Sequence, residues 1–331
     1  MGVRRPVVLS TPGQRAYALR LMQQLARWKA TAFTDAAMHV PAQLVEKCLA
    51  FVREQQADAI VAYGGGSAIG LAKAIALETG VPILAIPTTY AGSEMTPVYG
   101  ITRDGVKQTG RNSDVQPAIV IYDPKLSTAL PVAPSVTSAL NAMAHAAEGL
   151  YAHDGNPVID VIACEGIRAM GTAIPGFYKN PESLESRAQA LYGAWMCGMV
   201  LAKVSMSLHH KLCHTLGGSF NLPHAELHAV ILPHVLAFNS QAAPAAMRLI
   251  ETAMDKIPGT GAAVTLKRLA EDHGAPVSLR ELGMKEADLD SAAALAVNQA
   301  YANPRPVGPR ELAEVRDLLQ RAYEGAAICG V

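Results

Sequence analysis

Histidines are concentrated in one short stretch of this sequence, and their spacing indicates a site that moves protons or binds a metal. Six of the ten histidines lie between His209 and His234, in the segment HHKLCHTLGGSFNLPHAELHAVILPH. His210 and His214 are four residues apart, so on a helix both imidazoles project from the same face. Neutral imidazole is the commonest metal ligand and the usual proton carrier near neutral pH. Each histidine alone also fits a hydrogen-bonded core or capping residue, but the set favours a site.

The residues after His214 indicate how further imidazoles reach the same point. We expect Gly217-Gly218 to end the first helix, and Asn221-Leu222-Pro223 to open a second helix. That second helix carries His224 near its start and His228 one turn later. Two helices that meet at such a turn aim several histidines at one place.

A third predicted helix, at 138–151, carries more polar groups among alanines. Asn141 and His145 are four residues apart on it, and Glu148 follows on nearly the same line. A side-chain oxygen and an imidazole at this spacing share one face and would join the histidines if the helices pack together. An ordinary buried pair of Asn and His is the alternative interpretation.

The elements that precede these helices alternate strands with helices, which is typical of a parallel sheet. Strands are predicted at 6–9, 58–62, 82–86 and 118–122, with helices through Leu25, at 41–55 and after Ser67, and a hairpin at 99–116. From residue 134 onward the pattern is helical almost to the end of the chain. We therefore predict an α/β dinucleotide-binding domain at 1–131 and an all-helical domain at 132–331.

Two polar turns follow neighbouring strands of this predicted sheet. Gly64-Gly65-Gly66-Ser67 joins a strand to a helix, where backbone N–H groups and the positive helix end suit a phosphate. A tight structural turn accounts for the glycines equally well. The next strand ends in Thr88-Thr89-Tyr90. Because open α/β sheets bind ligands at the carboxyl ends of their strands, the two turns together favour a dinucleotide.

Composition argues against several classes of partner. The chain has 331 residues, is 50% apolar and 17% charged, and carries 28 basic and 28 acidic residues. This balance favours neither nucleic acid nor an anionic membrane. The five cysteines are scattered without a Cys-x-x-Cys pair, and neither a signal peptide nor a long apolar span is recognised. We expect a cytoplasmic protein with no nucleic-acid or membrane partner.

Taken together, these motifs resemble the iron-containing (group III) alcohol dehydrogenase family. The resemblance covers nearly the whole chain and includes TSALNAMAHAAEGLYAHDGNP, HHKLCHTLGGSFNLPHAELHAVILPHV and the late NPRPV. It implies a Rossmann-like α/β domain and an all-α domain in a dehydroquinate synthase-like fold, with the active site in the cleft between them. Within the family, the chain is most similar to members that reduce 2-maleylacetate to 3-oxoadipate in aromatic-compound degradation. A small dicarboxylate substrate, NADH or NADPH, and a homodimer are implied with it.

The resemblance also implies roles for individual residues. The residues expected to bind the cofactor are Gly65, Gly66, Ser67, Thr88, Thr89, Thr96 and Lys107. The residues expected to be catalytic are His145, His210, His214 and His224, with His214 near the nicotinamide as the proton donor. Tyr90, Asn141 and Arg305 are candidates for substrate contact, and Arg310 is a further one; solvent-exposed roles remain open for both arginines.

Departures from the family pattern bear on the metal. Asn141 stands where the family has an acidic ligand, so a divalent cation would keep only the imidazoles of His145, His210 and His224. Because hard cations depend on carboxylate charge, we expect weak metal binding, and a dianionic substrate would meet less repulsion. His228 stands where many relatives have Asn. The family also begins with an extra segment before the first βαβ unit, so we expect a shortened start.

Three functions therefore stay open at this point. The first is the NAD(P)H-dependent reduction with histidines in place of a metal. The first strand ends at Ser10-Thr11 without an acidic residue for a ribose 2′-OH, so both cofactors are expected to be accepted. The second is a metal-dependent (Fe or Zn) dehydrogenase acting on a small alcohol or aldehyde. The third is a non-catalytic metal- or nucleotide-binding protein.

Overall fold

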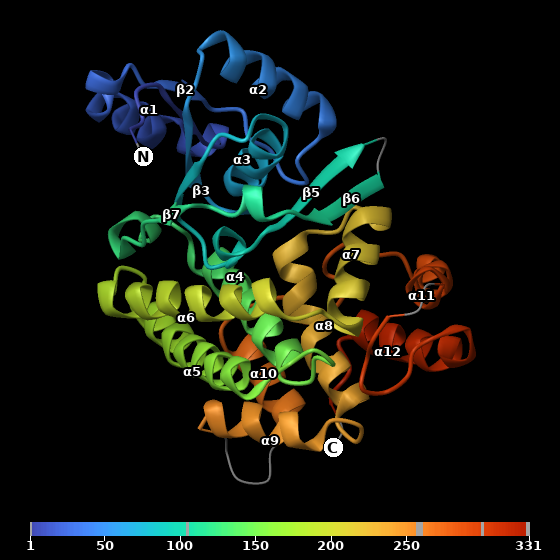
Figure 1. The fold of residues 1–331 in the computed structure, drawn as a ribbon. Helices are drawn as coiled ribbons and strands as arrows, with labels where there is room; N and C mark the ends of the chain where they lie inside the picture. Colours follow the sequence, from blue (N-terminus) through green and yellow to red (C-terminus); the bar gives the residue numbers. More distant parts are fainter. Residues whose placement is uncertain (1, 104–105, 256–260, 299–300, 329–331) are drawn as a thin grey trace. The chain divides into compact units, whose positions relative to one another are not determined.

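The fold of this chain is given by a computed structural model that describes residues 2–103, 106–255, 261–298 and 301–328. The chain divides into two compact units, Met1–Ala129 and Leu130–Val331 (Figure 1). The domain limits predicted from the sequence, 1–131 and 132–331, remain a prediction.

The first unit is built on a parallel five-stranded sheet with the strand order β2-β1-β3-β4-β7. Its strands are β1 (Pro6–Leu9), β2 (Thr31–Phe33), β3 (Ala59–Gly64), β4 (Ile83–Pro87) and β7 (Ile119–Val120). Near-continuous apolar runs such as β1 and β3 are typical of strands that are buried on both faces. The predicted parallel α/β fold is confirmed. The edge strand β2 was not predicted, because three residues are too few to show a periodicity.

Helices cover both faces of this sheet, as Figure 1 shows. They are α1 (Arg15–Gln24), α2 (Ala42–Glu54) and α3 (Gly66–Thr79). Val7 and Leu9 of β1 belong to one hydrophobic cluster with residues of α2 and α3, whereas Val8 belongs to another with Ala18 of α1. This division follows from the alternation of side chains along a strand.

A separate antiparallel pair completes the first unit, with β5 (Val98–Arg103) and β6 (Val106–Arg111). It corresponds to the predicted hairpin, although the expected turn at Asp104-Gly105 lies outside the described residues.

The second unit consists of helices and the segments that connect them, and its described residues contain no strand. The helices are α4 (Val132–Gly149), α5 (Pro157–Lys179), α6 (Leu184–Lys203), α7 (Leu208–Phe220), α8 (His224–Asn239), α9 (Pro244–Ala253), α10 (Ala262–Asp272), α11 (Leu289–Val297) and α12 (Leu312–Glu324). The alanine-rich α4 is buried over most of its length and packs against α5, α6 and α8 (Figure 1). The predicted all-helical fold of this part is confirmed.

The expected helix end at Gly217-Gly218 is wrong. α7 continues to Phe220 and ends at Asn221, which takes a left-handed conformation with φ of 53°. Gly217 is buried inside the helix, and a Cβ there would lie 3.6 Å from Leu227 of α8. A glycine in a helix costs about 1 kcal/mol relative to alanine but does not break the hydrogen-bond ladder, so α7 continues through both glycines.

Each unit carries one of the two tryptophans. The guanidinium of Arg27 lies 3.6 Å from the ring centre of Trp28 in the first unit. In the second unit, Trp195 on α6 meets Tyr192 edge to face, with 6.1 Å between ring centres.

Within the described ranges, no single helix has the length and apolar character to cross a membrane. The bent pair of α6 and α7 meets those two criteria only when its helices are taken together.

Candidate functional site

Three helices of the second unit bring six imidazoles together, and we call this set the histidine cluster. Its members are His145 on α4, His209, His210 and His214 on α7, and His224 and His228 on α8. His228 is fully buried, and its ring centre lies 6.0 Å from that of His145, 5.0 Å from His210 and 4.5 Å from His224. The predicted convergence of α4, α7 and α8 therefore exists.

Two hydrogen bonds order the buried part of the cluster. The Nδ1 of His145 lies 2.8 Å from the Nε2 of His210, and the Nδ1 of His210 lies 2.7 Å from Oε2 of Glu148. Because a carboxylate oxygen accepts, the Nδ1 of His210 carries the proton and its Nε2 accepts from His145. The order of donation thus runs from His145 through His210 to Glu148.

The cluster grades from buried to solvent-exposed. His145, His210 and His228 are buried, His224 is half-buried, and His214 is exposed. The rings of His214 and His224 are stacked, with 6.3 Å between their centres and 14° between their planes. A group that must take protons from water is best placed at the exposed end, where His214 lies.

Burial keeps the inner histidines neutral. It lowers the pKa of His210 and of His228 well below the usual value, with smaller contributions from neighbouring histidines. It also lowers the pKa of His209 to about 3. Burial raises the pKa of the Glu148 carboxyl, while His209 and the backbone N–H groups of Ser207, His209 and His210 act in the opposite direction.

The described part of the site offers several neutral nitrogen and oxygen donors to a metal but no free carboxylate. The ligand nitrogens of His209, His210 and His228 lie within 4.8 Å of one another, so this group could hold an ion. Among the described residues, the Oδ1 of Asn141 and both ring nitrogens of His228 are buried without a hydrogen-bond partner. Imidazole and amide donors suit Zn²⁺ or Fe²⁺, but the nearby carboxylate of Glu148 bonds to α7 instead.

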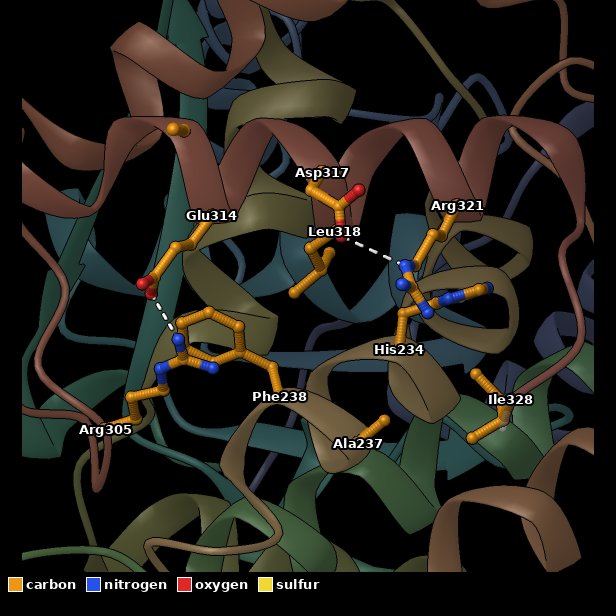
Figure 2. A pocket seen from close by; sticks show the side chains of 10 residues that line it. His234, Ala237, Phe238, Arg305, Glu314, Asp317, Leu318, Arg321 and Ile328 are labelled. Atoms are coloured by element: carbon orange, nitrogen blue, oxygen red, sulfur yellow. Dashed lines mark hydrogen bonds and ion pairs between the residues drawn. The ribbon is translucent and has the colours of Figure 1, made fainter. Parts of the chain in front are cut away.

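Arg305 lies in a different pocket of the second unit, shown in Figure 2. This cavity of about 480 Å³ is lined by residues of α8 and α12, among them His234, Phe238 and Leu318. The Arg305 guanidinium pairs with Glu314 and lies 4.2 Å from the ring centre of Phe238. Its assignment to the substrate stays a prediction, and so does that of Arg310, which is exposed.

In the first unit, the glycine turn has the shape that a phosphate needs. β3 ends at Gly64, which has a φ of 145°, and α3 begins at Gly66 without any side chain capping its first turn. A Cβ on Gly65 would lie 2.6 Å from the methyl group of Thr89, whereas one on Gly66 would meet nothing within 4 Å. The N–H groups at the start of this long helix therefore offer a cradle for a pyrophosphate.

The other predicted cofactor residues lie in varied settings. Thr88 is buried and its Oγ1 accepts from Gln14, at 2.7 Å. Thr96 is buried too, and its Oγ1 accepts from the Nζ of Lys73, at 2.8 Å. Tyr90, a predicted substrate residue, is fully buried, and the side chain of Lys107 lies outside the described residues.

Lys73 forms a buried polar centre that the sequence did not indicate. Its Nζ also donates to the carbonyl oxygens of Ser93 and Val98, at 2.6 and 2.8 Å. Burial lowers the pKa of Lys73 to about 7, and the buried Glu94 opposes that shift. Glu94 accepts from the hydroxyl of Tyr122 at 2.9 Å, and burial raises its own pKa. These bonds join α3 to the segment that leads into β5.

Glu148 and His209 are site residues to which the sequence reasoning gave no role. A signal for Glu148 was present, since it is an acidic residue one turn after His145 in an alanine-rich helix. For His209 no such signal was present in the sequence, because it is adjacent to His210 and neighbouring residues on a helix rarely face the same point. The rings of His209 and His228 nevertheless lie 4.8 Å apart.

Comparison with known proteins gives a consistent result along the whole chain. A family model described as Fe-containing alcohol dehydrogenase family, C-terminal, matches residues 135–323, and one described as Iron-containing alcohol dehydrogenase matches residues 1–124. A maleylacetate reductase from Burkholderia cepacia is 55% identical over 325 residues, which is 98% of this chain and 91% of that protein.

Solved structures agree with these matches. The crystal structure of maleylacetate reductase from Agrobacterium tumefaciens has a TM-score of 0.92 and 50% sequence identity, covering 98% of this chain and 91% of that one. A 1,3-propanediol oxidoreductase, at 27% identity, still reaches a TM-score of 0.90 over 97% of this chain and 93% of its own.

Proposed function

This chain belongs to the Fe-containing alcohol dehydrogenase family and is an oxidoreductase with maleylacetate reductase activity, and we propose that its histidine cluster is where the substrate is reduced. The observation that carries this proposal is the hydrogen-bonded pair of His145 and His210, inside a cluster that ends at the exposed His214.

The chemistry of the reduction defines what these residues must do. Maleylacetate is a small dicarboxylate with a carbonyl group conjugated to a double bond. Its conversion to 3-oxoadipate adds a hydride to an electron-poor carbon and a proton to the neighbouring carbon, while negative charge builds up on the enolate oxygen. Bound NADH or NADPH supplies the hydride. The protein must stabilise the oxygen and deliver the proton.

Neutral imidazoles suit the first of these tasks. We assign His145, His210 and His224 to the polarisation of the substrate carbonyl, which requires an N–H group aimed at its oxygen. Because His210 donates its ring proton to Glu148 and His145 donates its own to His210, His145 would redirect its N–H from His210 to the carbonyl oxygen when the substrate binds. Asn141 supports this assignment, because an amide at the family's acidic position places no negative charge beside a dianion. Of the six histidines, the exposed His214 is the one that we assign to proton delivery, since it can be reprotonated from water.

The first unit would hold the cofactor through its glycine turn. The backbone N–H groups of Gly65, Gly66 and Ser67 would face the pyrophosphate at the uncapped start of α3. Thr89 packs against Gly65, so it would shape the same turn.

A metal at this site would be held by neutral donors, chiefly imidazoles. His145, His210 and His224 are the predicted ligands, and the nitrogens of His209 and His228 add to the possible set. When bound, such an ion would polarise the substrate carbonyl as a Lewis acid. Because no carboxylate is offered to it, we infer weak binding and a reaction that the histidines support themselves.

The test follows NADH absorbance with purified protein and maleylacetate, with and without a strong chelator. We expect rapid oxidation that does not depend on the chelator. Activity that appears only with added Fe²⁺ or Zn²⁺, or only with simple aldehydes, would favour a metal-dependent alcohol dehydrogenase instead. The homodimer stays a prediction, which sedimentation of the same sample will check.

A further inference from the structure

Glu148 makes an unusual number of bonds for a fully buried carboxylate. It lies on α4, one turn after His145, and it accepts several hydrogen bonds from α7 and from the residue before that helix. Oε2 accepts from the backbone N–H of Ser207 at 2.9 Å, and Oε1 accepts from that of His209 at 2.8 Å. The backbone N–H of His210 lies 3.4 Å from Oε2.

These bonds replace the cap that α7 lacks. Ser207, the N-cap residue, makes no side-chain capping bond, so the first N–H groups of the helix need partners from elsewhere. Glu148 supplies three of them, and the amide oxygen of Asn303 lies 3.4 Å from the N–H of Leu208. A carboxylate also interacts favourably with the positive end of the helix dipole.

Of the two residues that cap α7, Glu148 and Asn303, only Glu148 also contacts a proposed catalytic side chain in the described structure. Its Oε2 lies 2.7 Å from the Nδ1 of His210, which places the ring proton on Nδ1 and leaves the lone pair on Nε2. That lone pair receives the Nδ1 proton of His145, at 2.8 Å. The orientations and tautomers of two catalytic histidines therefore depend on one carboxylate.

We propose that Glu148 is a positioning residue for the reduction, which fixes the tautomer and the direction of His210 and, through it, those of His145. This inference rests on the proposed function, because it assumes that the pair of His145 and His210 acts on the substrate.

A neutral cap would be sufficient for the helix alone. Asn303 caps the same turn of α7 with an uncharged amide and makes no bond to a histidine of the cluster in the described structure. Burying a charged carboxylate costs more free energy than burying a neutral amide that caps the same helix. A Gln side chain has an acceptor at only one of the two oxygen positions, because its nitrogen donates and does not accept. It therefore cannot keep both the bond from the N–H of His209 and the bond from the Nδ1 of His210.

The test compares Glu148→Gln, Glu148→Asp and the matched control Asn303→Ala, which removes a cap of α7 without touching the cluster. Steady-state kinetics with maleylacetate and NADH, thermal unfolding, and ¹⁵N NMR of the histidine rings are measured for each variant. We expect Glu148→Gln to lower kcat by roughly 10- to 100-fold, with the KM for NADH little changed. Glu148→Asp should recover part of that loss, and Asn303→Ala should lower the melting temperature while keeping kcat.

The NMR spectra report the tautomer of His210, which would not change if Glu148 only stabilised the helix. In the parent, the His210 ring should show a protonated Nδ1, and in Glu148→Gln that tautomer should be lost or mixed. A kcat for Glu148→Gln within about twofold of the parent would overturn the proposal. An equal fall of kcat in Asn303→Ala at equal stability would overturn it too. His210→Ala, measured in parallel, separates the two hypotheses: if this variant keeps normal turnover, the proposed function of the cluster has failed instead.

Discussion

His234 should make the second unit sensitive to acid, and the size of the effect follows from its surroundings. This histidine is 4% exposed on α8 and lies at the pocket of Figure 2. Burial lowers its pKa to about 4, with smaller contributions from the positive charges of Lys267 and Arg321. Those two cations lie on α10 and α12 and are themselves paired with Glu271 and Asp317.

The sign of the effect follows from proton binding. In the unfolded chain the imidazole has a pKa of about 6.5, so between that pH and about 4 the unfolded state binds a proton that the folded state does not bind. The contribution of His234 to the free energy of unfolding is therefore fully present above pH 6.5 and is lost as the pH falls toward 4. Between pH 7.5 and pH 5 the two pKa values correspond to a loss of about 2 kcal/mol from this residue.

Replacing His234 with Gln removes this titration while keeping a polar side chain of similar size. We expect the difference in unfolding free energy between pH 7.5 and pH 5 to shrink by about 2 kcal/mol, whatever the change at pH 7.5. Urea unfolding followed by circular dichroism at both pH values measures it, and the same substitution at the exposed His153 is the control. A pH dependence equal to that of the parent in His234→Gln would refute the reasoning.

Three further predictions concern the metal, the cofactor and the proton. Asn141→Asp adds the missing carboxylate, so it should raise the Fe²⁺ or Zn²⁺ retained after dialysis and raise the KM for maleylacetate; unchanged metal content would contradict this. Gly65→Ala places a Cβ 2.6 Å from the methyl group of Thr89, so NADH affinity, measured by fluorescence titration, should fall by roughly tenfold. Gly171→Ala, whose Cβ meets nothing within 4 Å, is its control, and equal affinity in the two variants would argue against a tight turn at Gly65. His214→Ala should abolish turnover while leaving NADH binding intact, and near-normal turnover would disprove its role in proton delivery.

The sequence was sufficient wherever local spacing decides the outcome. The four-residue intervals between Asn141 and His145, and between His210 and His214, correctly indicated shared helix faces. The strand before Gly64 and the helix after it were predicted for the same reason, since apolar runs and glycines report local backbone preferences.

The sequence was insufficient wherever a contact joins distant residues. Glu148 and His210 are separated by 62 positions, and no local pattern announces the bond between them. The end of α7 was misplaced for a related reason, because the glycine pair looked like a helix end and proved to lie inside the helix, where Gly217 faces Leu227 of α8. Lys73 looked like an ordinary helical lysine, and only the fold surrounds its amine with oxygen atoms.

The placement of the tryptophans allows the folding of the two units to be observed separately. Parallel strands that are far apart in the chain form slowly, whereas helix contacts between near neighbours form quickly. Trp28 belongs to the sheet-containing unit and Trp195 to the helical one. The variant Trp195→Phe keeps only the tryptophan of the first unit, and Trp28→Phe keeps only that of the second. Stopped-flow fluorescence of the two variants during refolding would therefore show whether the helical unit folds before the sheet has formed.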